Sequence, residues 1–190
     1  MQMLLSSGSP RRKELLSLLG IPFQVVAPNI PEVKQLNETP ETFCLRVSRE
    51  KAILVAQKYP DALVIGADTI VVIDGTILGK PRGPSEAYDF LLLLQDKMHS
   101  VLTGYTIALG NHSISKVVKT KVRFRAMTAK EISWYVSTGE PMDKAGAYAV
   151  QGIGSLFIEK IHGCYTNVIG LPLSHLYKDL KKFGVQLQSE

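Results

Sequence analysis

The most constraining feature of the sequence is an almost continuous apolar run from Leu63 to Ile73, rich in valine and isoleucine. Such a run is typical of a β-strand that is buried on both faces of a sheet. One charged residue, Asp68, lies in the middle of the run, where an unpaired charge is strongly unfavourable. The sequence therefore predicts a central strand whose carboxylate has either a structural Lys or Arg partner or a metal-binding or catalytic role.

Expected strands and helices alternate along most of the chain, which favours an α/β fold. Two helix starts are predicted by an N-cap residue followed by proline at the first helical position: Ser-Pro at 9–10 and Thr-Pro at 39–40. The second helix is expected to run to about residue 59. Thr128 and Glu131 have the spacing of a capping box. We also expect strands at 3–6, 23–27, 76–78, 100–109, 115–125 and 156–161, helices at 85–94 and after 172, and loops at 28–37 and 138–154.

Composition places the chain among ordinary globular proteins, with 45% hydrophobic and 21% charged residues. No apolar stretch approaches the ~20 residues that span a bilayer, and the N-terminus lacks the basic region of a signal peptide, so we expect a soluble, cytoplasmic protein with no membrane partner. Cys44 and Cys164 form no CxxC pair, which favours buried thiols in a reducing compartment. With no repeat or linker, residues 1–190 are expected to form one domain, either undivided or with two lobes around a cleft.

The net charge of +5 is compatible with nucleic acid or with small phosphate-bearing substrates. The basic residues are scattered, so a stable nucleic-acid complex is not expected. The segment SGSPRR at 7–12 leads from a strand into a helix N-terminus, where unpaired N–H groups and the helix dipole favour an anion. Arg11 and Arg12 lie in that first turn, which predicts phosphate binding; the alternative is a solvated pair of surface arginines.

Lys51 lies within the apolar stripe of the second helix, four residues after Val47 and four before Val55. Its side chain either extends along the surface to reach water or points into a cleft to meet an anion. The buried carboxylate of Asp68 on the next strand favours the second interpretation. Gly66 and Ala67 are expected to leave space for another group to approach Asp68, and Glu32 is a candidate second acid.

Two further segments carry candidate ligands. Lys80, at the end of a hairpin, is a candidate phosphate ligand, although a turn lysine is usually only solvated. Gln151 precedes a Gly-Ile-Gly segment and could contact a base edge with its amide, unless this is a plain surface loop. The sequence has no GxxxxGK[ST], HExxH or GxSxG motif, and its histidines lack ligand spacing. The remaining Arg, Lys, Asp and Glu residues suit metal-assisted attack of water on a phosphoryl group.

Taken together, these segments resemble the Maf family of nucleoside triphosphate pyrophosphatases over nearly the whole chain. The resemblance implies a mixed α/β fold with an elongated central sheet, flanking helices and a central cleft, similar to inosine triphosphate pyrophosphatases. It also implies a divalent cation, Mg or Mn, a cytoplasmic location and homodimers as a common assembly. The matching motifs are SGSPRRKELL at 7–16, EKA at 50–52, GADT at 66–69, GKP at 79–81, TG at 103–104, GEPMDKAGAY at 139–148, QG at 151–152 and NVIGLP at 167–172.

The resemblance assigns roles residue by residue. Asp68 matches the catalytic acid that accepts a proton from water, and Glu32 and Asp68 are the expected metal ligands. Glu32 matches least closely, because the family usually has an acidic pair where this chain has Pro31-Glu32. The expected substrate and phosphate ligands are Ser9, Arg12, Lys51 and Lys80.

Specificity is expected to depend on three further positions. Arg11, Thr69 and Gln151 match the subgroup that acts on dTTP and UTP, whereas the subgroup preferring 7-methyl-GTP has Trp at the position of Arg11. The expected activity is hydrolysis of dTTP and UTP to the monophosphate and pyrophosphate. The alternative is a partner-binding regulator of septum formation or cell division, but a pure binder has no use for Asp68 and Lys51 in apolar surroundings.

Overall fold

The structure, a computed structural model, describes residues 1–187. The chain forms two compact units: unit 1 contains residues 1–68, 103–118 and 170 onward, and unit 2 contains residues 69–102 and 119–169. Three strands run through both ranges, so that β3 passes from unit 1 to unit 2 between Asp68 and Thr69. No helix in the described part of the chain is long and apolar enough to cross a membrane.

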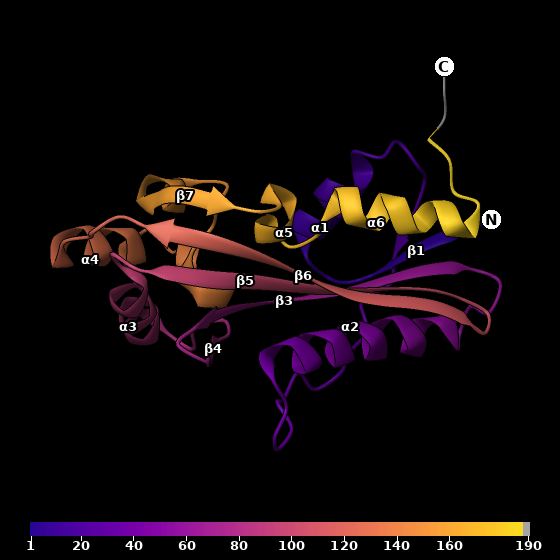
Figure 1. The fold of residues 1–190 in the computed structure, drawn as a ribbon, viewed down its shortest axis with the longest axis horizontal. Coiled ribbons are helices and arrows are strands. Elements are labelled where there is room, and N and C mark those ends of the chain that lie inside the picture. The colour runs from indigo at the N-terminus through magenta and orange to yellow at the C-terminus, as the bar shows by residue number, and fades with distance from the viewer. Residues whose placement is uncertain (188–190) are drawn as a thin grey trace. The chain divides into compact units, whose positions relative to one another are not determined.

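The strands form one seven-stranded mixed sheet in the order β2-β1-β3-β5-β6-β7, with β4 paired to β3 (Figure 1). β1 pairs in parallel with β2 and β3, whereas β3 pairs with β4, and β6 with β7, in antiparallel fashion. The predicted α/β class is therefore confirmed. The strands are β1 (Met3–Ser6), β2 (Gln24–Val25), β3 (Leu63–Ile73), β4 (Thr76–Leu78), β5 (Met98–Leu109), β6 (His112–Phe124) and β7 (Ile158–His162).

The helices begin where local sequence signals predict. The Thr39 side chain accepts a hydrogen bond from the Thr42 N–H, and Thr128 and Glu131 form a complete capping box. Ser9 is the N-cap of the first helix, although its side chain makes no capping hydrogen bond. The α-helices are α1 (Pro10–Ser17), α2 (Pro40–Ala56), α3 (Pro84–Leu94), α4 (Ala129–Ser137), α5 (Tyr165–Ile169) and α6 (Leu173–Leu180).

Three expectations about local structure differ from the observed elements. The strand expected at 23–27 is reduced to the two residues of β2. The loop expected at 138–154 contains two short 3₁₀ helices, η1 (Glu140–Asp143) and η2 (Ala145–Ala147), and the start of a third, η3 (Ile153–Phe157). Helix α5 was not predicted, because its five residues are too few to show a helical period.

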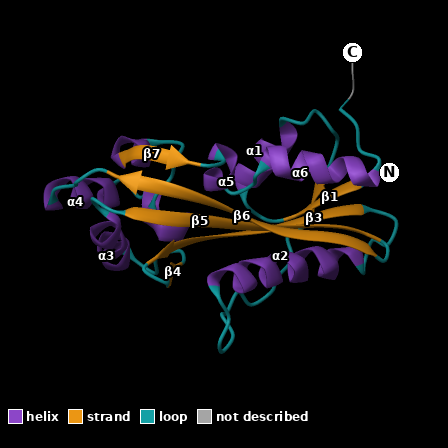
Figure 2. Ribbon diagram, in the orientation of Figure 1, coloured by secondary structure: helices purple, strands orange, loops and turns teal. Residues whose placement is uncertain are grey.

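In unit 1, α2 and α6 pack on opposite faces of β5 (Figure 2). Gly104 faces the backbone of α2, while the next residue, Tyr105, donates a hydrogen bond from its hydroxyl to Asp179 of α6 at 2.7 Å. Successive side chains of a strand point to opposite faces, so this pair of neighbours fixes which helix covers which face. The carboxylate of Asp179 also accepts hydrogen bonds from Lys116 and Lys182.

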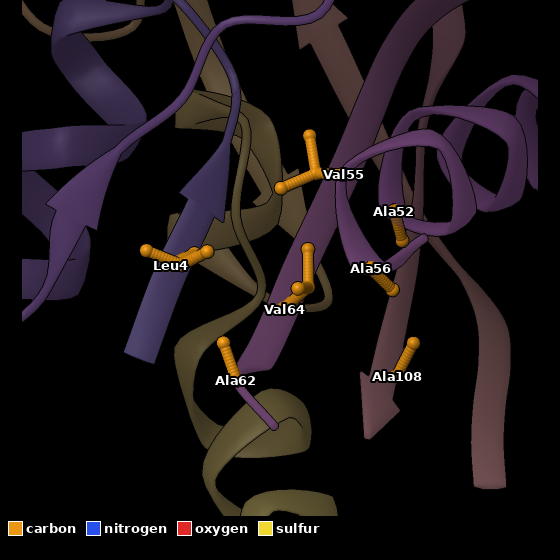
Figure 3. Close-up of a cluster of buried hydrophobic side chains, with 7 residues drawn as sticks. All are labelled: Leu4, Ala52, Val55, Ala56, Ala62, Val64 and Ala108. Atoms are coloured by element: carbon orange, nitrogen blue, oxygen red, sulfur yellow. The ribbon is translucent and has the colours of Figure 1, made fainter. Parts of the chain in front are cut away.

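Small side chains bring α2 close to the sheet. A buried cluster between α2 and strands β1, β3 and β5 contains four alanines, and Figure 3 shows these side chains gathered between helix and strands. A Cβ added at Gly66 would lie 2.5 Å from Ser48 O, and one at Gly104 would lie 2.5 Å from Cys44 O. The group that approaches the chain at Gly66 is therefore the backbone of α2. The cluster consists of Leu4, Ala52, Val55, Ala56, Ala62, Val64 and Ala108.

Candidate active site

The centre of the site in unit 1 is the ammonium group of Lys51. Its Nζ lies 2.8 Å from Asp68 Oδ1 on β3 and 2.7 Å from Glu32 Oε1 on the loop before α2. Lys51 and Asp68 are only 6% and 5% exposed, whereas Glu32 is exposed. Lys51 therefore points inward, as predicted, and one cation holds a buried carboxylate and a surface carboxylate together.

The close packing of α2 on the sheet holds the Lys51–Asp68 pair in place. Lys51 O accepts a hydrogen bond from the buried hydroxyl of Ser6 at 2.6 Å. The Cys44 thiol donates to Asp68 O at 3.2 Å and accepts from Gly104 N at 2.9 Å, so it links α2 to both β3 and β5. Burial raises the pKa of Cys44 to about 12, which keeps the group a neutral thiol. The backbone on both sides of the ion pair is therefore held by buried polar contacts.

Arg12 is a buried neighbour of this centre. Its Nε donates to Gly170 O at 2.9 Å and its Nη1 donates to Ser7 Oγ at 3.0 Å. Burial lowers the pKa of the guanidinium, and the negative charges of Asp68 and Glu32 act in the opposite direction. The alternative of two solvated surface arginines is therefore wrong for Arg12.

The neighbouring residues of the first turn are more accessible. Arg11 and Ser9 are both partly buried, and Ser9 N donates to Ser7 Oγ at 3.3 Å. Because the Ser9 hydroxyl does not cap its own helix, it remains at the helix N-terminus as a group that a substrate phosphate could engage. Its proposed role in phosphate binding stays a prediction.

The loop that carries Glu32 is held by an arginine that the sequence did not single out. Arg46 on α2 donates from Nη2 to Val33 O at 2.9 Å and from Nε to Glu38 Oε1 at 2.6 Å. Its Nη1 also contacts Glu50 one turn later at 3.0 Å. The hydrogen bond from Arg46 lowers the pKa of Glu38 to about 2. Arg46 thus fixes the backbone next to Glu32, and only the Arg46–Glu50 spacing gave a local hint of this cluster.

Three of the predicted site residues, Thr69, Lys80 and Gln151, belong to unit 2. Thr69 directly follows Asp68 in β3 and is partly buried, whereas Lys80 and Gln151 are exposed. The charged site residues that lie together in the structure are therefore those of unit 1. The roles proposed for Thr69, Lys80 and Gln151 stay predictions.

Comparison with known proteins assigns the family. The family model described as Maf-like protein matches residues 2–183 of this chain. The chain belongs to the Maf-like family. The resemblance predicted from the motifs is therefore confirmed over nearly the whole sequence.

Curated relatives of this Maf-like protein are similar over almost their full length. A protein of Syntrophus aciditrophicus is 49% identical over 185 residues, which cover 96% of this chain and 90% of the relative. A protein of Acinetobacter baylyi is 46% identical over 178 residues, with 94% and 97% covered. A protein of Bacillus cereus is 41% identical over 186 residues, with 98% and 97% covered. All three relatives are named dTTP/UTP pyrophosphatase.

The Maf-like site offers a small donor set for a metal. Within residues 1–187, no group of three or more His, Cys, Asp or Glu side chains is placed to hold a metal ion. Glu32 and Asp68 nevertheless share one partner, so a carboxylate oxygen of each lies within 2.8 Å of Lys51 Nζ. Mg²⁺ typically takes one or two carboxylates and completes its shell with substrate phosphates and water. This pair fits such an ion, which would compete with the Lys51 ammonium for the same oxygens.

Proposed function

We propose that this Maf-like protein hydrolyses nucleoside triphosphates to the monophosphate and pyrophosphate, with dTTP and UTP as preferred substrates. The observation that carries the proposal is the buried pair of Lys51 and Asp68, joined by Glu32 and flanked by Arg12. A buried carboxylate beside several cations is the arrangement that in-line attack of water on a phosphoryl group needs. The names of the three relatives point to the same reaction.

Asp68 is the proposed proton acceptor. A water molecule attacks the α-phosphorus, its proton passes to the Asp68 carboxylate, and the bond from that phosphorus to the α,β-bridging oxygen breaks. Pyrophosphate leaves with the electrons of that bond. The contact at 2.8 Å between Lys51 Nζ and Asp68 Oδ1 orients the carboxylate, and the Asp68 side chain is buried.

The phosphate groups are proposed to contact Ser9, Arg12, Lys51 and Lys80. Lys51 can exchange part of its contact with Glu32 for a phosphate oxygen, because Glu32 is exposed and the Lys51 ammonium has three donors. Arg12 contributes positive charge from a position fixed by Gly170 O and Ser7 Oγ. Charges held in place before the reaction stabilise the developing negative charge without reorganisation.

A divalent cation, Mg or Mn, is proposed as the cofactor, with Glu32 and Asp68 as its protein ligands. When bound, it would supply Lewis-acid stabilisation of the phosphate charge. Arg46 would keep the Glu32 loop in a position to bind the ion, since it holds the carbonyl of the next residue, Val33. A cytoplasmic location and a homodimer are proposed from the family resemblance alone.

Base recognition is proposed for Arg11, Thr69 and Gln151. A pyrimidine with a 4-carbonyl and an N3–H presents one acceptor and one donor, and the single amide of Gln151 can answer both. Cytosine reverses this pattern, so a fixed neighbouring donor would be left unpaired. Unpaired buried polar groups discriminate strongly between ligands of the same shape.

The reaction is tested by hydrolysis of dTTP in ¹⁸O-labelled water with Mg²⁺ or Mn²⁺, followed by mass spectrometry of both products. Label in the monophosphate supports attack at the α-phosphorus. Label in the pyrophosphate would move the attack to the β-phosphorus. Release of orthophosphate and a nucleoside diphosphate would contradict the proposed function.

A further inference from the structure

The Glu140 carboxylate of unit 2 is surrounded by hydrogen-bond donors. Its Oε2 accepts from Ile153 N at 2.9 Å, and its Oε1 accepts from Gly154 N at 2.9 Å and from the Tyr135 hydroxyl at 2.7 Å. Burial by itself would raise the pKa of Glu140, but these hydrogen bonds outweigh it and lower the pKa. The group is therefore an ionised acceptor at neutral pH, which matches three donors.

Tyr135 extends the same contact to the other end of the loop. Its fully buried hydroxyl donates to Glu140 and accepts from Ala149 N at 3.2 Å. The pair of Glu140 and Tyr135 thus holds the backbone at Ala149 on one side and at Ile153 and Gly154 on the other. The exposed Gln151 lies between these fixed points.

Gly152 shows how closely the loop wraps the carboxylate. Its φ of +120° lies in the region that side chains rarely adopt, and a Cβ built there would lie 2.5 Å from Glu140 Oε2. The loop therefore passes directly over the carboxylate at the residue after Gln151. The backbone that presents the Gln151 amide is shaped around Glu140.

We propose that Glu140 is a positioning residue that sets base specificity by holding the Gln151 loop. The inference rests on the proposed function, since it assumes that Gln151 reads the base. Glu140 itself contacts loop backbone and Tyr135, so its effect on the substrate passes through Gln151. A rigid loop presents the amide in one orientation, whereas a loose loop lets the amide turn to meet cytosine as well.

The test compares kcat and KM for dTTP and CTP in the wild type, Glu140→Gln, Gln151→Ala and the double variant. Gln keeps the size of Glu140 but directs an NH₂ group at one of the backbone donors. We expect the dTTP-to-CTP ratio of kcat/KM to fall roughly tenfold in Glu140→Gln. The loss should appear mainly as a higher KM for dTTP, because base contacts are made before and during the reaction.

Glu131→Gln is the matched control in the same unit. Glu131 also accepts hydrogen bonds from a backbone N–H and a hydroxyl, both of Thr128, and from Arg125 Nη2, and neither donor residue belongs to the 149–154 loop. Loss of the Glu131 carboxylate should lower the free energy of unfolding without changing the dTTP-to-CTP ratio of kcat/KM. Tyr135→Phe is a second probe, since it removes the hydroxyl that bridges Glu140 and Ala149 while keeping the ring, and it should shift the ratio in the same direction.

Amide hydrogen exchange gives a readout that does not depend on activity. Exchange at Ile153 and Gly154 should become faster in Glu140→Gln and stay at the wild-type rate in Glu131→Gln; unchanged exchange would overturn the inference. The double variant should have the same ratio as Gln151→Ala alone, and losses that multiply would show that Glu140 acts independently of Gln151. A wild type that hydrolyses no nucleotide would contradict the proposed function instead, while the exchange result would still decide whether Glu140 holds the loop.

Discussion

Replacing Gly66 by alanine tests how α2 positions Lys51. The backbone of Gly66 lies in an ordinary strand, so alanine meets no conformational barrier at this position. Its Cβ, however, would lie 2.5 Å from Ser48 O, 2.7 Å from Ala52 N and 2.9 Å from Ala52 Cβ. Two of these three atoms belong to the backbone, so no side-chain rotation relieves the clash, and α2 must move away from β3.

The size of the effect follows from this geometry. Overpacking a close-packed interior by one methyl group costs about 1–3 kcal/mol of unfolding free energy. For a chain of this size, each kcal/mol lowers Tm by roughly 2–4 °C, so we expect Tm to fall by about 2–12 °C. Lys51 precedes Ala52 on the displaced helix, so its contact with Asp68 should loosen. Misplacement of a positioned group by 1 Å can cost about 10²-fold in rate, so kcat should fall roughly ten- to hundredfold.

The assays are thermal unfolding followed by circular dichroism and kcat for dTTP. Gly104→Ala should behave similarly, because a Cβ at Gly104 would lie 2.5 Å from Cys44 O. Gly79→Ala is the stability control, since a Cβ there meets nothing within 4 Å. A wild-type Tm and wild-type kcat in Gly66→Ala would refute the close packing of α2 on β3.

Two further predictions concern buried carboxylates. Asp68→Asn keeps the size but removes the proposed proton acceptor, so kcat should fall on the order of 10² to 10⁴ while the circular dichroism spectrum is retained; wild-type turnover would leave Asp68 as a structural partner of Lys51. Burial would raise the pKa of Asp179, but hydrogen bonds from Lys116, Lys182 and Tyr105 lower it from 3.8 to about 2. The contribution of ionised Asp179 to the free energy of unfolding is therefore complete above the ordinary pKa of 3.8 and is lost as the pH falls towards 2. Asp179→Asn should reduce the free energy of unfolding at neutral pH by roughly 2 kcal/mol and flatten its decline in acid, and an unchanged acid slope would contradict this account.

Much of the fold could be predicted from local sequence signals. The apolar run at 63–73 coincides with β3, and the caps at Thr39 and Thr128 start α2 and α4. These signals work because hydrophobic periodicity and end capping act over a few neighbouring residues. The placement of Lys51 within an apolar stripe, together with the buried Asp68 on the next strand, likewise predicted a lysine that points inward. Helix α5 was not predicted, and the strand expected at 23–27 was predicted too long, because such short elements have too few residues to show a period.

The sequence by itself also determined the family, since its motifs follow in the expected order along the chain. It indicated which residue types carry the chemistry, because Asp68 is a charge within an apolar run and needs a partner. It did not determine the partners. Glu32, Lys51 and Asp68 lie on a loop, a helix and a strand, and only packing of those elements brings their charged groups within 2.8 Å.

Tertiary structure alone decided several features that sequence patterns left open. The sequence indicated space for another group beside Gly66, and the structure shows that the backbone of α2 occupies it. Arg46 holds the Glu32 loop, and Glu140 holds the loop of Gln151, although neither residue stands out in its sequence context. The physical reason is that close packing and hydrogen bonds depend on distance in space, not on distance along the chain. Glu140 and Gly154 are 14 residues apart in the sequence, and Lys51 and Asp68 are 17 apart, yet each pair is in direct contact. Local propensity determines where a helix begins, but only the packed chain determines which backbone a carboxylate meets.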